Sequence, residues 1–533
     1  MRRFLILTQL MTPVTIALIL AVSPVRAEPA VTTPWGVVNE PLYPSHICAT
    51  LAAALHSVKG SIDTYDADGV HTEPDKERIQ SAINTCSNGA VKLILGVNNE
   101  DGFLTGPLIL KSGVTLWIDR GVTLFASRDP RDYDTGAGDC GTANRSLKKS
   151  CRSLIEGQNI SQSGLVGDGK IDGRGGSLLL SGPNKGLRSW WDVAWQSKQG
   201  LMQHNFRLVQ IDGGDDLTFY RLTFENSPNF HIVPNGITGL TVWGIKILSP
   251  SLSYTQPGYA CPDKTTPDRL TPATCFTPDT VKNTDGFDPG NSKDVLLAYS
   301  YLSTGDDNVA IKSGGKGGGS HHQVYAHNWF YYGHGMSVGS ETDSGIDDIS
   351  VTDLTLDGMD SSNGNGLRIK SDASRGGRVR QIIYDGICMK NEIRPIVIDT
   401  HYSDNGGLLF PDFQNIVIRN FHALGSVKVG NGTLTFRGFR SGAISLPITI
   451  DMDKVTFDGT PPNFSTGHRK PDGRAEAVHF QIGSADMQFA KIIPVSPVDD
   501  VTVNLVEGRA PASSRDCTHA FLPLKSVLSD SPF

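Results

Sequence analysis

Helical periodicity is scarce in this chain of 533 residues, and aromatic side chains make up only 8% of it. The clearest helical segment covers residues 76–86, where Ile79, Ala82 and Ile83 fall on one face. Much of the rest consists of short apolar runs between Gly, Asn and Asp turns. The sequence therefore predicts a mainly β protein with one short helix near its N-terminus.

Long apolar runs are also missing, except at the start of the chain. Arg2 and Arg3 precede an apolar stretch over residues 4–22, and small residues stand three and one positions before Glu28. This order predicts a secretory signal peptide over residues 1–27 and hence a secreted, extracellular protein. A transmembrane anchor is the alternative, but Thr, Gln and Pro interrupt the run and it is short for a membrane span.

Positive charge is in short supply. The formal net charge is −7, and loss of the three arginines in the leader makes it −10. This balance argues against nucleic acid and anionic membranes as partners, and we expect a soluble monomer with no membrane contact once the leader is removed. A polyanionic substrate would need a local basic site.

Cysteine pairs at the CxxC spacing are absent, which argues against a zinc ribbon or a thioredoxin-type site. The eight cysteines fit an exported protein with disulfides instead. Two pairs have the spacing of small loop staples, a third is plausible, and the fourth is what remains. These pairings are a hypothesis among roughly one hundred possible connectivities: Cys140–Cys151, Cys261–Cys275, Cys48–Cys86 and Cys388–Cys517.

Similar β-type runs recur from residue 207 onward, with a loose period of about 25 residues. A Pro-rich insertion over residues 250–280 lengthens one interval. A repeat of this length, made of strands and turns with almost no helix, predicts an all-β parallel β-helix. An antiparallel sandwich or barrel would fit the short strands but not the sustained repeat. The runs begin at Leu217, Leu240, Val295, Val324, Ile349, Val379 and Ile416.

The second strand of each repeat can be aligned in the same way. Its central apolar residues are expected to point inward together, and equivalent residues on adjacent rungs of a parallel stack lie about 4.8 Å apart. Asp285, Asp307 and His334 then become vertical neighbours, with Asp306 beside them. The aligned inward positions are Phe287, Val309, Met336, Leu367 and Ile396.

Three carboxylates this close cannot all ionise freely, so at least one pKa rises and a proton donor stands beside ionised bases. Glycosidic bond hydrolysis requires that combination, because one acid protonates the leaving oxygen while another carboxylate activates water. Arg368 and Lys370 lie two apart on a strand and are expected to face solvent together. With Lys312 they would form a basic strip that holds an anionic sugar. Turn chemistry or a calcium site are the alternative readings of the acidic cluster.

Four short motifs stand in order at rung spacing: NTDGFD over 283–288, GDD over 305–307, GHGMSVGS over 333–340 and RIK over 368–370. Together they resemble the polygalacturonases of glycoside hydrolase family 28, loosely from residue 114 to residue 402. The resemblance implies a right-handed, single-stranded parallel β-helix. It also implies inverting hydrolysis of the α-1,4 bonds of polygalacturonate or pectin, endo-acting, without a metal or other cofactor.

The resemblance also implies roles for individual residues. Asp306 would be the general acid, Asp285 and Asp307 would activate the water, and His334 would tune the protonation of Asp306. The residues implied to bind substrate are Arg368, Lys370 and, by a looser local match, Tyr402. Asn283, which opens the first motif, is a further candidate for substrate binding. Lys312 departs from the pattern of many family members, and we expect it to add a subsite contact.

The predicted organisation has three parts: the signal peptide over 1–27, an N-terminal extension and cap over 28–105, and the catalytic β-helix over 106–533. The function leaves alternatives open. An exo-acting galacturonosidase differs only in whether loops close the cleft, and the insertion over 250–280 is a candidate wall. A rhamnogalacturonan hydrolase is disfavoured by the GHG and RIK motifs. A calcium-dependent pectate lyase would lose activity in chelator, and a non-catalytic adhesin or pectin-binding protein would not need the acidic cluster.

Overall fold

The computed structural model describes most of the chain beyond the predicted leader, which lies outside the described residues. The described residues are 29–146, 148–197, 200–268, 271–315, 317–403, 405–425, 433–458, 463–465, 478–483, 501–506, 509 and 515–533. None of the helices within these ranges has both the length and the apolar character of a membrane span.

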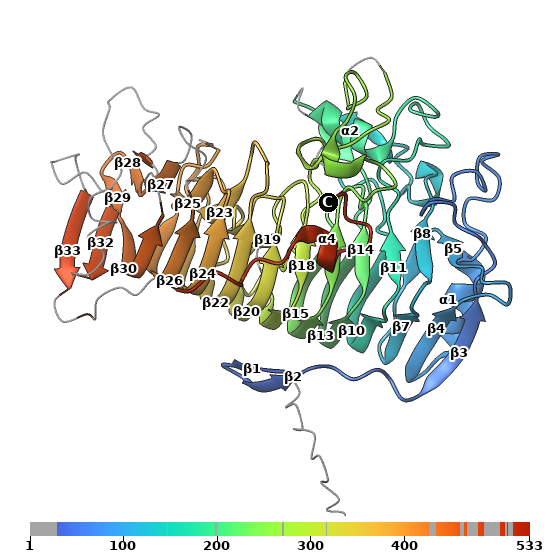
Figure 1. Cartoon of the computed structure of the whole chain (residues 1–533), viewed down its shortest axis with the longest axis horizontal. Coiled ribbons are helices and arrows are strands. Elements are labelled where there is room, and N and C mark those ends of the chain that lie inside the picture. Colours follow the sequence, from blue (N-terminus) through green and yellow to red (C-terminus); the bar gives the residue numbers. More distant parts are fainter. Residues whose placement is uncertain are drawn as a thin grey trace, which may run out of the picture.

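The architecture is a right-handed parallel β-helix, elongated along the stacking direction of its strands (Figure 1). Its longest row of strands pairs in parallel from one end of the described chain to the other. This first row contains β3 (Ile47–Ala52), β4 (Gly89–Ile94), β7 (Val114–Ile118), β10 (Ile155–Val166), β13 (Val209–Tyr220), β15 (Ile232–Trp243), β17 (Lys293–Ala298), β20 (Ser320–Phe330), β22 (Ile346–Asp357), β24 (Arg378–Lys390), β26 (Asp412–Leu424), β30 (Ile448–Phe457), β32 (Val478–Gly483) and β33 (Val501–Val506).

Two rows of shorter strands complete the turns of the coil. The second row contains β5 (Gly102–Thr105), β8 (Thr123–Ala126), β11 (Lys170–Asp172), β14 (Thr223–Glu225), β16 (Lys246–Leu248) and β18 (Tyr301–Ser303). The third row contains β19 (Val309–Ile311), β21 (Met336–Val338), β23 (Asn365–Lys370), β25 (Arg394–Asp399), β27 (Thr433–Arg437) and β31 (Asn463–Ser465). The short strand β6 (Leu108–Ile109) pairs with the start of β10, so the first residues of β10, β13 and β15 continue the third row toward the N-terminus.

The core is a stack of inward-pointing apolar side chains. In the third row, Phe287, Val309, Met336, Leu367 and Ile396 are consecutive register partners, and each is at most 1% exposed. The predicted alignment of these positions is confirmed. Full burial of a side chain of this size contributes roughly 1.5–3 kcal/mol, so every rung adds a similar increment to stability.

The starting residues of the recurring runs are not register partners at two positions in the first row. The structure pairs Val295 with Gln323 rather than Val324, and Ile349 with Ile382 rather than Val379. Gln323 is completely buried and donates a hydrogen bond to the backbone oxygen of Ser292, 2.9 Å away. A polar residue therefore fills an inward position, and an alignment made on apolar residues alone slips past it.

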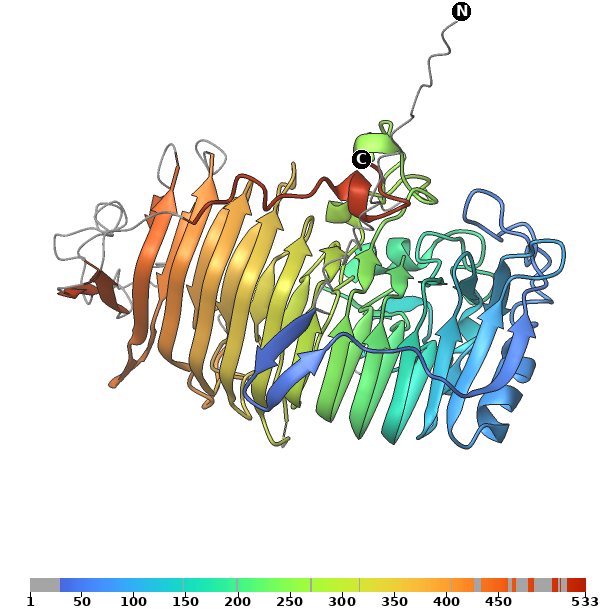
Figure 2. The ribbon, with the colours of Figure 1, turned by 60° about the horizontal axis from the view of Figure 1, so that its bottom comes forward.

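Antiparallel hairpins form small two-stranded sheets outside the three rows of the coil. The first, β1 (Ala30–Thr33) with β2 (Gly36–Asn39), lies along the outer face of the first row, where Val31 joins an apolar cluster with Tyr220 and Trp243 (Figure 2). The two others are β9 (Thr142–Asn144) with β12 (Met202–His204), and β28 (Phe439–Ser441) with β29 (Ile444–Leu446).

The C-terminal segment, residues 515–533, runs back along the coil toward earlier rungs (Figure 2). The indole Nε1 of Trp329 donates to the backbone oxygen of Ala520 at 3.0 Å. Further along, Asp530 forms an ion pair with Lys170 on β11. We call residues 515–533 the return segment.

Helices are few and short in the described chain. The predicted helix is confirmed as α1 (Lys76–Thr85), with Ile79, Ala82 and Ile83 buried as expected. It packs against β3, β4 and β6 at the N-terminal end of the coil. The other α-helices are α2 (Trp190–Gln196) and α4 (Leu524–Val527), and 3₁₀ turns cover Pro130–Asp132, Pro257–Tyr259 and Pro278–Thr280.

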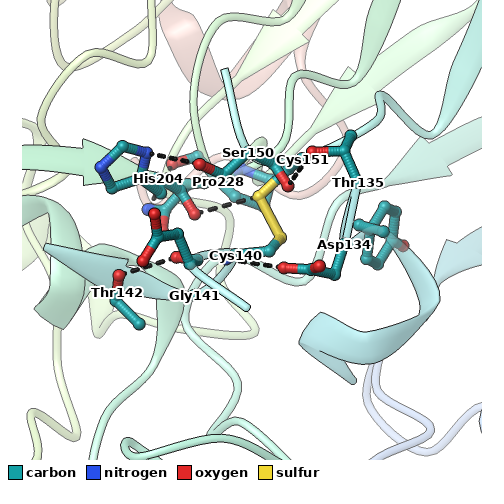
Figure 3. Close-up of a disulfide and its surroundings, with 12 residues drawn as sticks. Asp134, Thr135, Cys140, Gly141, Thr142, Ser150, Cys151, His204 and Pro228 are labelled. Carbon is teal, nitrogen blue, oxygen red and sulfur yellow. Dashed lines mark hydrogen bonds between the residues drawn. A yellow bond between two sulfur atoms is a disulfide. The ribbon is translucent and has the colours of Figure 1, made fainter. Parts of the chain in front are cut away.

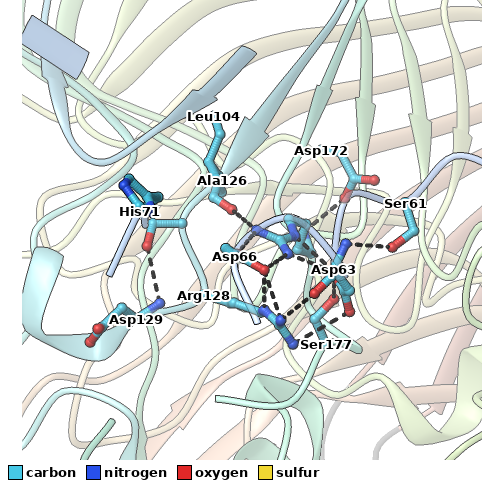
Figure 4. Close-up of polar contacts among 12 residues, drawn as sticks. Ser61, Asp63, Asp66, His71, Leu104, Ala126, Arg128, Asp129, Asp172 and Ser177 are labelled. Carbon is cyan, nitrogen blue, oxygen red and sulfur yellow. Dashed lines mark hydrogen bonds and ion pairs between the residues drawn. The ribbon is translucent and has the colours of Figure 1, made fainter. Parts of the chain in front are cut away.

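The N-terminal extension is fastened to the coil by a buried ionic network (Figure 4). Asp66, fully buried, accepts hydrogen bonds from Arg128 at 2.7 Å and from Arg174 at 2.7 Å. Asp63 accepts a further bond from Arg174 at 2.6 Å. The extension also supplies β3, β4 and β5 to the coil, so the domain boundary after residue 105 stays a prediction.

All four predicted disulfides are confirmed: Cys48–Cys86, Cys140–Cys151, Cys261–Cys275 and Cys388–Cys517. The last joins β24 to the return segment across 129 residues of sequence. The second ties the loop before β10 beside β12, where Ser150 contacts His204 (Figure 3).

Candidate active site

The two adjacent aspartates, Asp306 and Asp307, lie in the turn between β18 and β19. Asn308 holds this turn, because its side-chain amide donates to the backbone oxygen of Tyr332 at 2.8 Å and accepts from the backbone of Gly335 at 3.0 Å. The backbone N–H of Gly305 donates to the Thr284 hydroxyl at 2.9 Å. The turn is thus fixed from both neighbouring rungs.

Register brings the acidic residues and the histidine into one column. Asp285, Asp307 and His334 each stand two residues before an inward partner of the aligned third row. The backbone N–H that follows Asp285 donates to the backbone oxygen of Asp307 at 2.8 Å. The predicted stacking of these three residues is confirmed.

Asp306 is paired with His334. The Nδ1 atom of His334 lies 2.9 Å from Oδ1 of Asp306, and both side chains remain about a quarter exposed. Burial alone would raise the pKa of Asp306, but the nearby charges of His334, Lys370 and Arg368 more than offset it and lower that pKa well below the ordinary value. Asp306 is therefore ionised in the free protein.

Asp307 is buried among cations. Lys370 Nζ lies 2.7 Å from its Oδ2, Arg368 forms an ion pair with its Oδ1, and the Ser337 hydroxyl donates to Oδ1 at 3.0 Å. Burial would raise the pKa of Asp307, but Arg368 and Lys370 lower it. The prediction that Arg368 and Lys370 face solvent is wrong, because each is only 6% exposed and both are directed at Asp307.

The pKa of Asp285 is shifted in the opposite direction. Burial raises its pKa well above the ordinary value, and Asp306 and Asp288 raise it further. Its Oδ1 accepts no hydrogen bond from any residue in the described ranges. The cluster thus combines two carboxyl groups whose pKa values are lowered, Asp306 and Asp307, with one whose pKa is raised, Asp285.

Asp288 belongs to the same cluster, and sequence reasoning gave it no role. Burial raises its pKa to about 6, although Lys312 opposes the rise from 2.8 Å away. Strand alternation gave part of the signal, since an inward Phe287 places its neighbour Asp288 on the outward face. Lys312 is correspondingly committed to Asp288, so the predicted strip of Lys312, Arg368 and Lys370 consists of cations that already have carboxylate partners.

The two remaining predicted residues lie on either side of the cluster. The Tyr402 ring is 40% exposed and lies 5.0 Å from Lys370 Nζ. Asn283 accepts a hydrogen bond from Gln203 at 2.9 Å and lines a cavity on the N-terminal side.

A calcium ion does not suit the cluster. One ligand atom each of Asp306, Asp307 and His334 lie within 4.8 Å of one another. Calcium, however, takes six to eight oxygen ligands. Here Arg368 and Lys370 already neutralise Asp307, and their charges repel a further cation.

Comparisons with known proteins agree with this geometry. The chain matches the family described as Glycosyl hydrolases family 28 over residues 86–463. It is 54% identical over 508 residues to a polygalacturonase from Ralstonia solanacearum, covering 94% of this chain and 95% of that protein. It is 38% identical over 384 residues to an endo-polygalacturonase from Pectobacterium carotovorum subsp. carotovorum, covering 72% and 84% respectively. A solved polygalacturonase structure from Erwinia carotovora ssp. carotovora has a TM-score of 0.66 at 34% identity, covering 83% of this chain and 98% of that chain.

Proposed function

The chain belongs to family 28 of the glycosyl hydrolases, and we propose that it hydrolyses the α-1,4 bonds between galacturonate units of pectate, with inversion and in the interior of the polymer. The observation that carries the proposal is the column of clustered carboxyl groups beside His334, in which the pKa values of Asp306 and Asp307 are lowered and that of Asp285 is raised. Inverting hydrolysis needs one carboxylic acid and one carboxylate on opposite sides of the bond.

In this proposal Asp306 gives a proton to the glycosidic oxygen, while Asp285 and Asp307 hold and deprotonate the attacking water. Arg368 and Lys370 act through Asp307, which they keep ionised. Tyr402, exposed beside Lys370, meets the sugar ring.

The pKa of Asp306 is lowered in the free protein and that of Asp285 is raised, so Asp306 must gain a proton as substrate binds. We propose that a sugar carboxylate bound near His334 and Lys370 drives the protonation of Asp306. It competes with Asp306 for their positive charge and adds a negative charge nearby, and both effects raise the pKa of Asp306. Protonation of Asp306 removes a negative charge that raises the pKa of Asp285, so Asp285 can then release its proton and serve as a base.

Interior cleavage is supported by the relative that is named an endo-polygalacturonase and is 38% identical to this chain. Four disulfides support action outside the reducing cytoplasm, in keeping with a secreted protein. We propose that it acts there as a monomer.

The direct test is incubation of purified protein with polygalacturonate at about pH 5 in EDTA. We expect reducing ends to appear without the ultraviolet absorbance of unsaturated products, together with an early collapse of viscosity. A slow fall in viscosity at the same rate of reducing-end release would assign exo action. Activity that appears only on added calcium, with unsaturated products, would identify a lyase and overturn the mechanism.

A further inference from the structure

The column that contains Asp285 continues toward the N-terminus. Ile232 pairs with both Val209 and Phe287, so the residues two positions before these three stand in line: Arg207, Phe230 and Asp285. With about 4.8 Å per rung, Arg207 lies about 10 Å from Asp285 along the same face.

A cavity of about 290 Å³ opens at this place. Its lining includes Arg207, Phe230 and Asn283 from the coil, and Lys148 and Lys149 from the loop ahead of β10. The cavity therefore begins beside the candidate active site and is lined by three basic side chains.

Arg207 is a cation without a carboxylate partner. Its guanidinium packs over the Phe230 ring, 5.0 Å from the centroid, and donates to the amide oxygen of Gln210 at 2.6 Å. It forms no ion pair with any residue that the structure describes. Burial lowers the pKa of Arg207 below its ordinary value, as expected for a cation that has lost water without gaining a direct ion pair. Lys312, on the same ring at 4.5 Å, differs in being paired with Asp288.

Lys149 is in the same situation. Lys149 is exposed at the rim of the cavity, and within the described part of the chain it has no hydrogen-bond or ion-pair partner. Desolvation and the like charge of Arg207 lower its pKa. Among the carboxylates, Asp288 and Asp212 have the largest effect on the pKa of Arg207, which they raise. Glu156 raises the pKa of Lys149 in the same way. None of the three forms a direct ion pair with either cation.

The loop that carries Lys149 is held in place. The disulfide Cys140–Cys151 closes it, and His204 contacts it twice, with Nε2 2.8 Å from the Asn144 amide oxygen and Nδ1 3.2 Å from the Ser150 hydroxyl (Figure 3). The pairing of β9 with β12 fixes its other side. The ammonium of Lys149 therefore belongs to a loop that is fixed beside the cavity.

We propose that Arg207 and Lys149 form a subsite for the carboxylate of a second, unesterified galacturonate unit, on the N-terminal side of the bond that is cleaved. This inference rests on the proposed function. The guanidinium of Arg207 offers a planar fork that matches a carboxylate, and Lys149 adds a point charge. A methyl ester removes the negative charge, so the subsite selects de-esterified stretches of pectin.

The test compares Arg207→Gln and Lys149→Gln with the wild type on polygalacturonate and on highly methyl-esterified pectin. A charge-assisted hydrogen bond contributes enough that we expect KM for polygalacturonate to rise about tenfold to hundredfold in Arg207→Gln, with kcat changed less than about threefold. KM for esterified pectin should stay nearly constant, so the preference for the unesterified polymer falls by the same factor. Arg207→Lys should recover part of the loss.

Arg120→Gln is the matched control, because its side chain is 79% exposed on a turn outside the cavity and loses the same charge. Equal KM in wild type and Arg207→Gln, or an equal rise on both polymers in a variant that melts like the wild type, would overturn the subsite. Failure of the wild type itself to hydrolyse polygalacturonate would instead refute the proposed function.

Discussion

Lys370 Nζ lies 2.7 Å from Oδ2 of Asp307, although the two residues are 63 positions apart in the chain. With the ion pair from Arg368, this contact surrounds a 2% exposed carboxylate with two cations. Arg368 and Lys370 lower the pKa of Asp307 before any sugar binds, and they thereby favour its ionised form.

The first prediction concerns the pH profile of Lys370→Gln. Burial favours a protonated Asp307, and removal of one of the two cations that oppose it must raise its pKa. A base is lost when pH falls below its pKa, so the acidic limb of kcat/KM should move to higher pH. Lys370→Arg should retain most of the wild-type profile. An unmoved limb with only a higher KM would mean that Lys370 holds the substrate without lowering the pKa of Asp307.

The second prediction separates the acid from the base. Asp306→Asn and Asp285→Asn should each lower kcat on polygalacturonate by about a hundredfold to ten-thousandfold, the usual contribution of general acid–base groups. A nitrophenyl oligogalacturonide needs no proton on its leaving group, so it should restore turnover in Asp306→Asn and not in Asp285→Asn. The reverse pattern would make Asp285 the proton donor. Asp215→Asn, exposed on β13, is the control for loss of a carboxylate.

The third prediction concerns the anchoring of the N-terminal extension. Asp66→Asn would leave Arg128 and Arg174 buried without their shared carboxylate, and breaking a buried pair costs about 3–5 kcal/mol. Denaturant unfolding measures this loss, while kcat at 25 °C should stay near wild type because the network lies outside the catalytic cluster. A change below about 1 kcal/mol would contradict a structural role for the network.

Acid should weaken the same network. Burial would raise the pKa of Asp63, but Arg174 and Arg128 lower it below the ordinary value of about 3.9. A lowered pKa in the folded state gives stability that is present above that ordinary value and lost as pH falls through the folded value. The pH dependence of unfolding between about pH 4 and pH 2 should therefore be shallower in Asp63→Asn than in the wild type.

The fourth prediction concerns the disulfide Cys388–Cys517, which closes the longest loop of the four. Its replacement by two alanines should lower the free energy of unfolding by about 2–5 kcal/mol, since long loops lose the most entropy when cross-linked. KM and kcat should remain unchanged at 25 °C. Replacement of Cys261 and Cys275, 14 residues apart, should cost less, and the opposite ranking would contradict the loop-entropy argument.

The repeat was predictable because every rung places an apolar residue at the same inward position, as from Phe287 to Ile396. Where the rung breaks that rule, as at Gln323, the register could not be found from apolar residues alone. Short cysteine spacings were similarly informative, since a loop of 11 or 14 residues brings its ends together easily.

The residues that form the candidate site could be predicted, but the contacts between their side chains could not. Alternation places Arg368 and Lys370 on the outer face, but it does not say that Asp307, two rungs away, points toward them. Nor does it reveal that burial, Asp306 and Asp288 raise the pKa of Asp285. These properties depend on side-chain directions across rungs, which a single sequence does not encode locally.

The return segment changes how the coil should come apart. A stack in which each rung touches only its neighbours frays progressively from its ends. Here the disulfide at Cys388, the hydrogen bond from Trp329 and the ion pair at Lys170 join rungs that are not neighbours. The return segment couples the local stabilities of these rungs, so amide hydrogen exchange from β11 to β24 should be slow and concerted. Exchange should become stepwise once the return segment is removed.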